Sequence, residues 1–226
     1  MSKQFFYEDI AGDFDELMNA FDVRRRLEVV YDQFLTGDLT GLQLLDVGCG
    51  TGRFSERAHQ RGAEVVALDV GPNLLKQALA RADVSPVVGD GLRLPFQDES
   101  FDVVVSSEMI EHTTSPVTAV GEMARVLRPG GRLALTCPNK VWLWLVRLAT
   151  AVKLRPFDGY ENFPSFPDLE RFTNGHGLRI RSHIGLHPWP FQIRLLCGLS
   201  RWVDMRYGAG PWSRIMINQA ILADKP

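Results

Sequence analysis

Two carboxylates and an imidazole lie close together near the middle of this 226-residue chain. Glu108, Glu111 and His112 are spaced i, i+3 and i+4, which in a helical turn would place the three side chains on one face. Such a group can hold a divalent cation or can act as an acid and a base. The spacing therefore predicts metal or proton-transfer chemistry here. A surface pair of Glu111 and His112, with no metal, is the alternative.

A glycine-rich segment precedes these residues in the chain. Residues 44–52 read Leu-Leu-Asp-Val-Gly-Cys-Gly-Thr-Gly, a short apolar strand followed by three alternating glycines: Gly48, Gly50 and Gly52. Glycine leaves the backbone bare, so a ligand can lie against this loop before a helix expected over residues 53–61. The dinucleotide fingerprint Gly-x-Gly-x-x-Gly is not met, because Arg53 stands at its third glycine. With Asp46 ahead of the loop, the pattern favours a nucleoside ligand with a cationic amino-acid end and no pyrophosphate.

Apolar segments alternate with helical patterns from residue 44 to residue 136, which predicts an α/β fold with a parallel sheet. Further strands are expected over residues 64–69, 86–88, 101–106, 132–136, 178–181 and 215–222, and further helices over 72–81, 166–172 and from Pro116. The first four strands each end near an acid: Asp46, Asp69, Asp90 and Glu108. Ligands of such folds bind at the carboxyl ends of the strands, so this rim is the expected site.

Asp69 lies roughly 20 residues after the first glycine of the loop, where an α/β nucleotide site needs a carboxylate for the ribose hydroxyls. It is therefore the expected ribose ligand. The alternatives are local backbone roles, a helix N-cap for Asp69 and an ordinary turn for Asp90.

A strand ending in Asp-x-Gly-x-Gly-x-Gly resembles the first motif of the class I S-adenosylmethionine-dependent methyltransferases. The resemblance implies a Rossmann-like seven-stranded sheet, mostly parallel with an antiparallel last strand, in a single domain over residues 1–226. It implies S-adenosylmethionine as the cofactor, with Asp46 organising the loop and the methionine part, and Asp90 at the adenine amino group. One arginine of the run 24–26, here taken as Arg25, is expected near the methionine carboxylate. The remaining expected cofactor contacts are Gly48, Gly50, Gly52, Val70, Gly91 and Ser107.

The order Glu-x-x-Glu-His after the fourth strand resembles the ubiquinone-biosynthesis O-methyltransferases, which methylate phenolic hydroxyls on a polyprenylated ring. In that family these positions bind magnesium, so Mg²⁺ is expected at Glu108, Glu111 and His112. A phenol titrates near 10, and a cation on its oxygen would stabilise the nucleophilic anion. His112 as the catalytic base is the alternative. The resemblance is good over about residues 44–137 and fails at the N-terminus and over residues 188–211.

The remaining segments are expected to cover the site. Residues 1–40 are interpreted as helices, with Phe6, Ile10, Phe14 and Leu17 at helical spacing and a second helix over residues 23–35. Residues 141–165 and 188–212 are interpreted as apolar insertions that form a lid over a lipophilic acceptor. Each is too short for a membrane span of about 20 apolar residues, but aromatic and cationic margins suit a membrane surface. The alternative is that both only complete the core.

Composition limits the function classes. The net charge of −2 gives no general attraction to nucleic acid, and three distant cysteines favour reduced thiols over a disulfide framework. No basic start followed by an apolar run is present, so a cytoplasmic protein without a signal peptide is expected, with peripheral membrane contact. The predicted function is O-methylation of a hydroxylated, lipophilic small molecule. Two alternatives remain: metal-independent methylation of a carboxylate or amine, and a catalytically inactive cofactor-binding partner protein.

Overall fold

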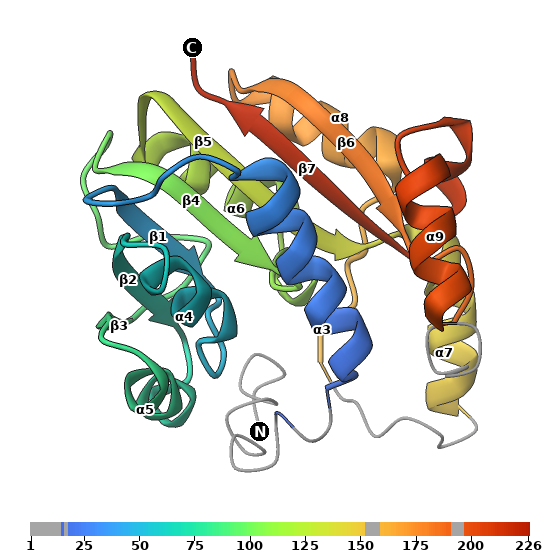
Figure 1. Ribbon diagram of the computed structural model, residues 1–226, viewed down its shortest axis with the longest axis horizontal. Coiled ribbons are helices and arrows are strands. Elements are labelled where there is room, and N and C mark those ends of the chain that lie inside the picture. Colours follow the sequence, from blue (N-terminus) through green and yellow to red (C-terminus); the bar gives the residue numbers. More distant parts are fainter. Residues whose placement is uncertain (1–14, 16–17, 152–158, 191–196) are drawn as a thin grey trace.

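The computed structural model describes residues 15, 18–151, 159–190 and 197–226. Its centre is a seven-stranded sheet with the strand order β3-β2-β1-β4-β5-β7-β6 (Figure 1). The strands are β1 Gln43–Val47, β2 Glu64–Asp69, β3 Ser85–Val88, β4 Phe101–Ser107, β5 Leu127–Pro138, β6 Arg179–Leu186 and β7 Asn218–Asp224. The first five strands pair in parallel, whereas β7 runs antiparallel to both β5 and β6. The predicted mostly parallel sheet with an antiparallel last strand is confirmed.

Two layers of helices cover the sheet. The helices are α3 Ala20–Leu27, the π-helix η3 Glu28–Phe34, α4 Arg53–His59, α5 Pro72–Arg81, η4 Ile110–His112, α6 Pro116–Val126, η5 Lys140–Trp142, α7 Leu143–Ala151, α8 Phe166–Gly175, α9 Cys197–Tyr207 and η7 Pro211–Ile215. Figure 1 shows α3 across one face of the sheet, and α7 and α9 beyond the end at which β6 finishes. The N-terminal positions Phe6, Ile10, Phe14 and Leu17 lie outside the described residues.

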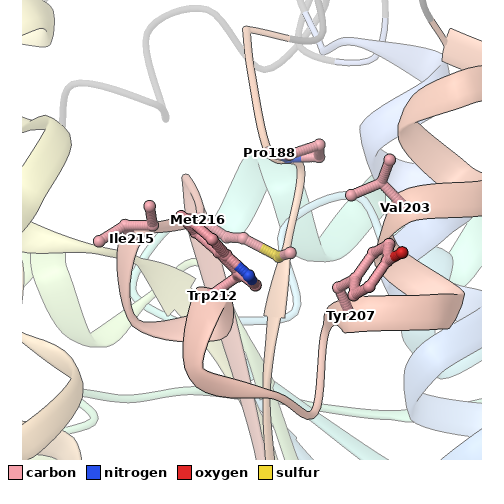
Figure 2. Close-up of a pocket in the computed structure, with 6 residues that line it drawn as sticks. All are labelled: Pro188, Val203, Tyr207, Trp212, Ile215 and Met216. Atoms are coloured by element: carbon pink, nitrogen blue, oxygen red, sulfur yellow. The ribbon is translucent and has the colours of Figure 1, made fainter.

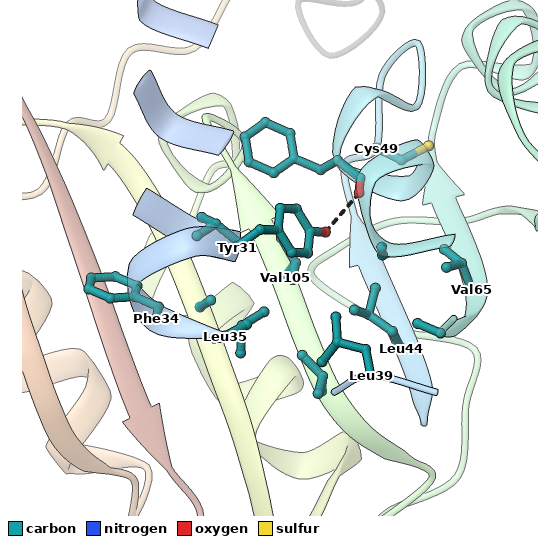
Figure 3. Close-up of a cluster of buried hydrophobic side chains, with 14 of the residues drawn as sticks. Tyr31, Phe34, Leu35, Leu39, Leu44, Cys49, Val65 and Val105 are labelled. Atoms are coloured by element: carbon teal, nitrogen blue, oxygen red, sulfur yellow. Dashed lines mark hydrogen bonds between the residues drawn. The ribbon is translucent and has the colours of Figure 1, made fainter. Parts of the chain in front are cut away.

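Side chains of the strands alternate between two buried clusters, as the two-residue period of a strand requires. Leu44 packs with residues of η3, α4 and α5, while its neighbour Leu45 packs with residues of α6 and α8 on the other face. Tyr31 lies in the first cluster, and its hydroxyl donates a hydrogen bond to the Phe54 carbonyl oxygen at 2.7 Å (Figure 3). The buried hydroxyl therefore has a partner, and η3 is attached to the helix that follows the glycine loop.

Three strand boundaries differ clearly from the expected ones, and one of them is the start of β5, at Leu127 rather than at residue 132. The last strand begins at Asn218 rather than at residue 215, because Pro211–Ile215 form a 3₁₀ helix that leads into it. The sixth strand continues to Leu186, well beyond the expected residue 181. Because β5 and β6 both run antiparallel to β7, they point the same way. The carboxyl end of β6 therefore lies at the same edge of the sheet as those of β1 to β5.

Candidate cofactor and acceptor site

The glycine loop joins β1 to α4 in a conformation that favours glycine. Gly48, Gly50 and Gly52 have φ angles of +73°, +54° and +82°, a region that other residues adopt only at a cost. The Gly48 and Cys49 N–H groups donate to the Leu68 carbonyl oxygen at 2.8 and 3.0 Å, which fastens the loop to β2. The alternating glycines thus have the conformational role that their spacing predicts.

Two of these glycines also allow close packing. A Cβ atom on Gly48 would overlap the side chain of Met109, and one on Gly52 would lie 2.7 Å from Cβ of Ala78 in α5. Met109 also lies against Gly91, where an added Cβ would be 3.0 Å from the Met109 methyl group. The sequence does not indicate this role of Met109, because its contacts, Gly48 and Gly91, follow two other strands, β1 and β3.

Asp69, the last residue of β2, holds the loop through its carboxylate. Its Oδ2 accepts a hydrogen bond from the Gly50 N–H, and its Oδ1 accepts one from the Gly71 N–H, both at 2.9 Å. The resemblance gave the loop-organising role to Asp46. In the structure, however, the Asp46 carboxylate accepts a hydrogen bond from the Ser55 hydroxyl in α4 at 2.6 Å. Asp69 therefore contacts the loop backbone directly, and Asp46 anchors the helix behind it.

Asp46 is almost completely buried. Burial raises its pKa to about 7; the hydrogen bond from Ser55 opposes this effect, and the nearby negative charge of Asp69 adds to it. Two carboxylates thus lie at the carboxyl ends of the neighbouring strands β1 and β2, and β1 borders the switch point at which the strand order reverses. A cationic ligand group beside them would relieve their repulsion.

The other expected cofactor residues lie along the same edge. Asp90 follows β3 and accepts a hydrogen bond from the Leu92 N–H at 2.9 Å, so part of its carboxylate serves a turn. Val70 follows β2 and is half-buried, Gly91 is buried, and Ser107 is the last residue of β4. All four predicted acids lie at the carboxyl ends of neighbouring parallel strands, as expected.

The arginine at this rim is Arg26 rather than Arg25. Arg25 turns toward α9, where its Nε donates to Asp204 at 3.4 Å, and its Nη1 donates to Glu28 at 3.3 Å. The Nη1 of Arg26 donates to the Ser107 hydroxyl at 2.6 Å, at the end of β4. The placement of Arg25 near the cofactor is corrected, because successive residues of a helix point about 100° apart. Spacing in the sequence does not separate the two arginines, because Arg26 pairs with Asp22 at i, i+4 and Arg25 pairs with Glu28 at i, i+3.

Glu108 does not share a helical face with Glu111 and His112. It precedes η4 with a φ angle of +56°, and its Oε1 accepts a hydrogen bond from the Thr136 hydroxyl at 3.2 Å. Burial raises the pKa of Glu108 to about 7, although the charge of Arg26 opposes this shift. The expectation of one shared face is wrong, because the left-handed backbone at Glu108 interrupts the helical turn.

Glu111 and His112 do form a pair. Glu111 is 1% exposed, and its Oε1 lies 3.7 Å from Nε2 of His112. The other ring nitrogen, Nδ1, lies 3.0 Å from the Tyr160 carbonyl oxygen. Since a carbonyl can only accept, Nδ1 must carry the hydrogen, and in the neutral ring Nε2 is then the basic nitrogen.

These donors do not fit the expected Mg²⁺. Within the described residues, no three or more His, Cys, Asp or Glu side chains are grouped so that they could hold a metal ion. Glu108 is bonded to Thr136, and the Glu111–His112 pair alone falls short of the oxygen-rich shell that magnesium prefers.

A second histidine reaches the rim from the end of β6. His187 is fully buried, has a φ angle of +60°, and donates from Nε2 to Asp22 at 2.9 Å. Its backbone N–H donates to Asp204 in α9 at 2.8 Å. Burial opposes the ionisation of Asp22, but Arg26 and His187 together lower its pKa to about 2. The sequence does not indicate this cluster, because its members are far apart in the chain.

The helices beside this cluster turn apolar side chains outward. None of the residues of α7 is buried, and the buried residues of α9 are the polar Ser200 and Asp204. Trp144 is 63% exposed and Trp202 is 58% exposed. Among the helices that the structure describes, none has the length and apolar character needed to cross a membrane.

An apolar cavity of about 310 Å³ lies beside α9 (Figure 2). Its lining comes from α9, from η7 and from the segments next to them: Pro188, Val203, Tyr207, Trp212, Ile215 and Met216. Pro188 directly follows His187, so the cavity adjoins the carboxyl end of β6.

Comparison with known proteins identifies the family. Residues 45–135 match a methyltransferase domain family. The ubiquinone biosynthesis O-methyltransferase of Aeromonas salmonicida is 30% identical over 216 residues, which cover 88% of this chain and 86% of that protein. The enzyme of the same name from Xanthomonas oryzae pv. oryzae is 39% identical over 172 residues, covering 70% and 72% of the two chains. The chain belongs to the class I S-adenosylmethionine-dependent methyltransferases.

Two further similar proteins match different shares of this chain. The demethylmenaquinone methyltransferase of Renibacterium salmoninarum is 36% identical over 133 residues, and this match spans 57% of the chain and 55% of that enzyme's length. A solved S-adenosylmethionine-dependent methyltransferase from Thermotoga maritima superposes with a TM-score of 0.73 at 20% identity, over 99% of this chain and 100% of that one. At this identity the structural likeness supports the fold alone.

Proposed function

We propose that this methyltransferase transfers the methyl group of S-adenosylmethionine to a hydroxyl oxygen of a lipophilic small molecule. One observation carries the proposal: α9 buries polar residues and, besides two arginines, exposes large apolar side chains beside an apolar cavity. A helix of a water-soluble surface has the opposite arrangement. The ubiquinone biosynthesis O-methyltransferases among the relatives support an oxygen acceptor with an apolar tail.

The cofactor is assigned to the rim around the glycine loop. Asp69 accepts hydrogen bonds from the ribose hydroxyls, and the bare backbone at the three glycines allows the cofactor to approach. Asp90 is assigned to the adenine amino group, with Val70 and Gly91 beside the ring. The methionine end then lies toward Ser107, where the carboxyl end of β4 meets Arg26.

The base is assigned to His112. In this proposal, Nε2 of His112 takes the proton of the acceptor hydroxyl, and the nearby Glu111 carboxylate stabilises the imidazolium. The acceptor oxygen forms a bond to the methyl carbon as the bond from that carbon to sulfur breaks. The electron pair returns to sulfur and gives S-adenosylhomocysteine and a methyl ether. The protein mainly aligns the two reactants.

Turnover of purified protein with labelled S-adenosylmethionine tests the function. Catechols, polyprenylated phenols and lipid extracts are compared as acceptors, and we expect prenylated phenols to give methyl ethers with the highest kcat/KM. His112→Gln is expected to lower kcat by about 100-fold or more, because a positioned base contributes 10² to 10⁴ in rate, while S-adenosylhomocysteine still binds. Equal turnover of water-soluble and prenylated phenols would contradict the lipophilic acceptor.

The exposed apolar faces of α7 and α9 are further proposed to contact a membrane surface, from which such an acceptor would be taken. We expect wild type to float with phosphatidylethanolamine–phosphatidylglycerol vesicles. Trp144→Ser/Trp202→Ser should bind roughly 10- to 100-fold more weakly, since each indole would bury a large apolar area. The control is Leu79→Ser on α5, where a similarly exposed apolar side chain lies outside α7 and α9. Equal flotation of all three proteins would exclude this contact.

A further inference from the structure

A buried guanidinium group binds Ser107, the residue directly before Glu108, where the resemblance to the ubiquinone enzymes implies a metal ion. Arg26 is 5% exposed. Its Nε and Nη2 donate to Oδ2 of Asp22 at 3.0 and 2.7 Å, and its Nη1 donates to the Ser107 hydroxyl at 2.6 Å. Arg26 therefore donates three hydrogen bonds, to acceptors on α3 and β4, and these hold its charge at the carboxyl end of β4.

A chain of hydroxyl groups connects Arg26 to Glu108. The Ser107 and Thr136 hydroxyl oxygens are 2.9 Å apart, and the Thr136 hydroxyl donates to Oε1 of Glu108. Because the single hydrogen of Thr136 goes to Glu108, Ser107 must donate to Thr136. The hydrogen bonds of this chain thus run from Arg26 toward Glu108, and the last of them, from Thr136, opposes the rise in the Glu108 pKa that burial causes.

The charges of Glu108 and Glu111, the two carboxylates expected to bind a metal, both affect the pKa of Arg26. Burial disfavours a charged Arg26, but the negative charges of Asp22, Glu108 and Glu111 together raise its pKa. An arginine does not lose its charge in proteins, and its planar group cannot turn away without breaking the paired bonds to Asp22. The positive charge beside Glu108 and Glu111 is therefore permanent.

We propose that Arg26 provides the positive charge opposite Glu108 and Glu111 that the resemblance assigns to a divalent cation, so that this methyltransferase works without one. A dication approaching the two carboxylates would be repelled by the guanidinium in a buried site, where charges interact strongly. Arg26 is a positioning residue, because it acts on the acceptor site through the carboxylates. The claim about turnover rests on the proposed function, whereas the claim about cation binding does not.

Calorimetric titration of the full chain with Mn²⁺, in the presence of S-adenosylhomocysteine, tests the proposal without an acceptor. We expect no saturable binding to wild type below millimolar concentration. Arg26→Gln removes the charge but keeps hydrogen-bonding groups, and should bind Mn²⁺ at least tenfold more tightly than wild type. The further change Glu111→Gln in that variant should abolish the gain. A loss of packing alone would not create a cation site.

Arg25→Gln is the matched control, because it removes the adjacent buried arginine, which pairs with Asp204 and Glu28 instead. It should bind no more Mn²⁺ than wild type. If Arg26→Gln does not fold, Asp22→Asn/Arg26→Gln removes both charges of the ion pair and is titrated in the same way. Tight Mn²⁺ binding to wild type that is lost in Glu111→Gln overturns the proposal, as does a folded Arg26 variant that shows no gain.

The turnover assay separates the two proposals. With an active acceptor, chelator should change wild-type turnover by less than twofold, and loss of turnover that Mg²⁺ restores would overturn the role of Arg26. If no acceptor is methylated while Mn²⁺ binds only to the Arg26 variants, the proposed function fails and the assignment of Arg26 stands.

Discussion

Asp69→Ala is expected to weaken the binding of S-adenosylmethionine by about 10- to 100-fold, because hydrogen bonds to a charged group each contribute on the order of 1.5–3 kcal/mol. The wild-type carboxylate is assigned to the ribose, and it also accepts hydrogen bonds from the Gly50 and Gly71 N–H groups. Removing it thus removes ligand contacts and loosens the glycine loop. Isothermal titration calorimetry with S-adenosylmethionine measures the loss.

Asp69→Asn separates the two contributions. The amide oxygen can still accept a hydrogen bond from one loop N–H group, so the loop should be better preserved than in Asp69→Ala. Urea unfolding of both variants shows how much of the lost affinity comes from folding. An unchanged affinity in folded Asp69→Ala would contradict the assignment of Asp69 to the cofactor.

Gly52→Ala is expected to lower the free energy of unfolding by about 2–4 kcal/mol, from backbone strain and a steric clash together. Gly52 has a φ angle of +82°, and an added Cβ would lie 2.8 Å from Cα of Ala78. That atom belongs to the backbone of α5, so α4 and α5 would have to move apart. Urea unfolding measures the change, and cofactor affinity should fall with it.

Gly130→Ala is the matched control for this variant. Gly130 has a similar φ angle of +78°, but an added Cβ would meet no atom within 4 Å. Its loss in stability should therefore report the backbone strain alone, about 1–2 kcal/mol. Equal losses in the two variants would show that the contact between Gly52 and α5 has no steric consequence.

The fold could be predicted because its signals are local. The strand at Glu64–Asp69 and the helix at Pro72–Arg81 have the bounds that their apolar pattern and the glycine and proline residues at their ends indicate. The alternating glycines after β1 adopt the positive φ angles that only their spacing suggested. Acids that end successive parallel strands must meet at one edge, so the rim followed from chain order alone.

The site could be predicted only in part. Asp69 and Asp90 lie on the expected edge, since each follows its strand directly. Arg25 was chosen over Arg26 because a run of arginines on a helix does not reveal which one faces the sheet. The shared face of Glu108, Glu111 and His112 assumed a regular helix, which the left-handed backbone at Glu108 interrupts.

The sequence by itself determined the alternation of strands and helices, the glycine loop and the acidic rim, because each depends on neighbours within about one strand-helix unit. Only the tertiary structure decided which charges meet. Arg25 contacts Asp204 across 179 positions of the chain, and His187 contacts Asp22 across 165. Such pairs depend on the orientation of α3 and α9 over the sheet, which no local periodicity encodes. The orientation of α9 follows from the same cause, since its Asp204 is held inward by Arg25 and His187.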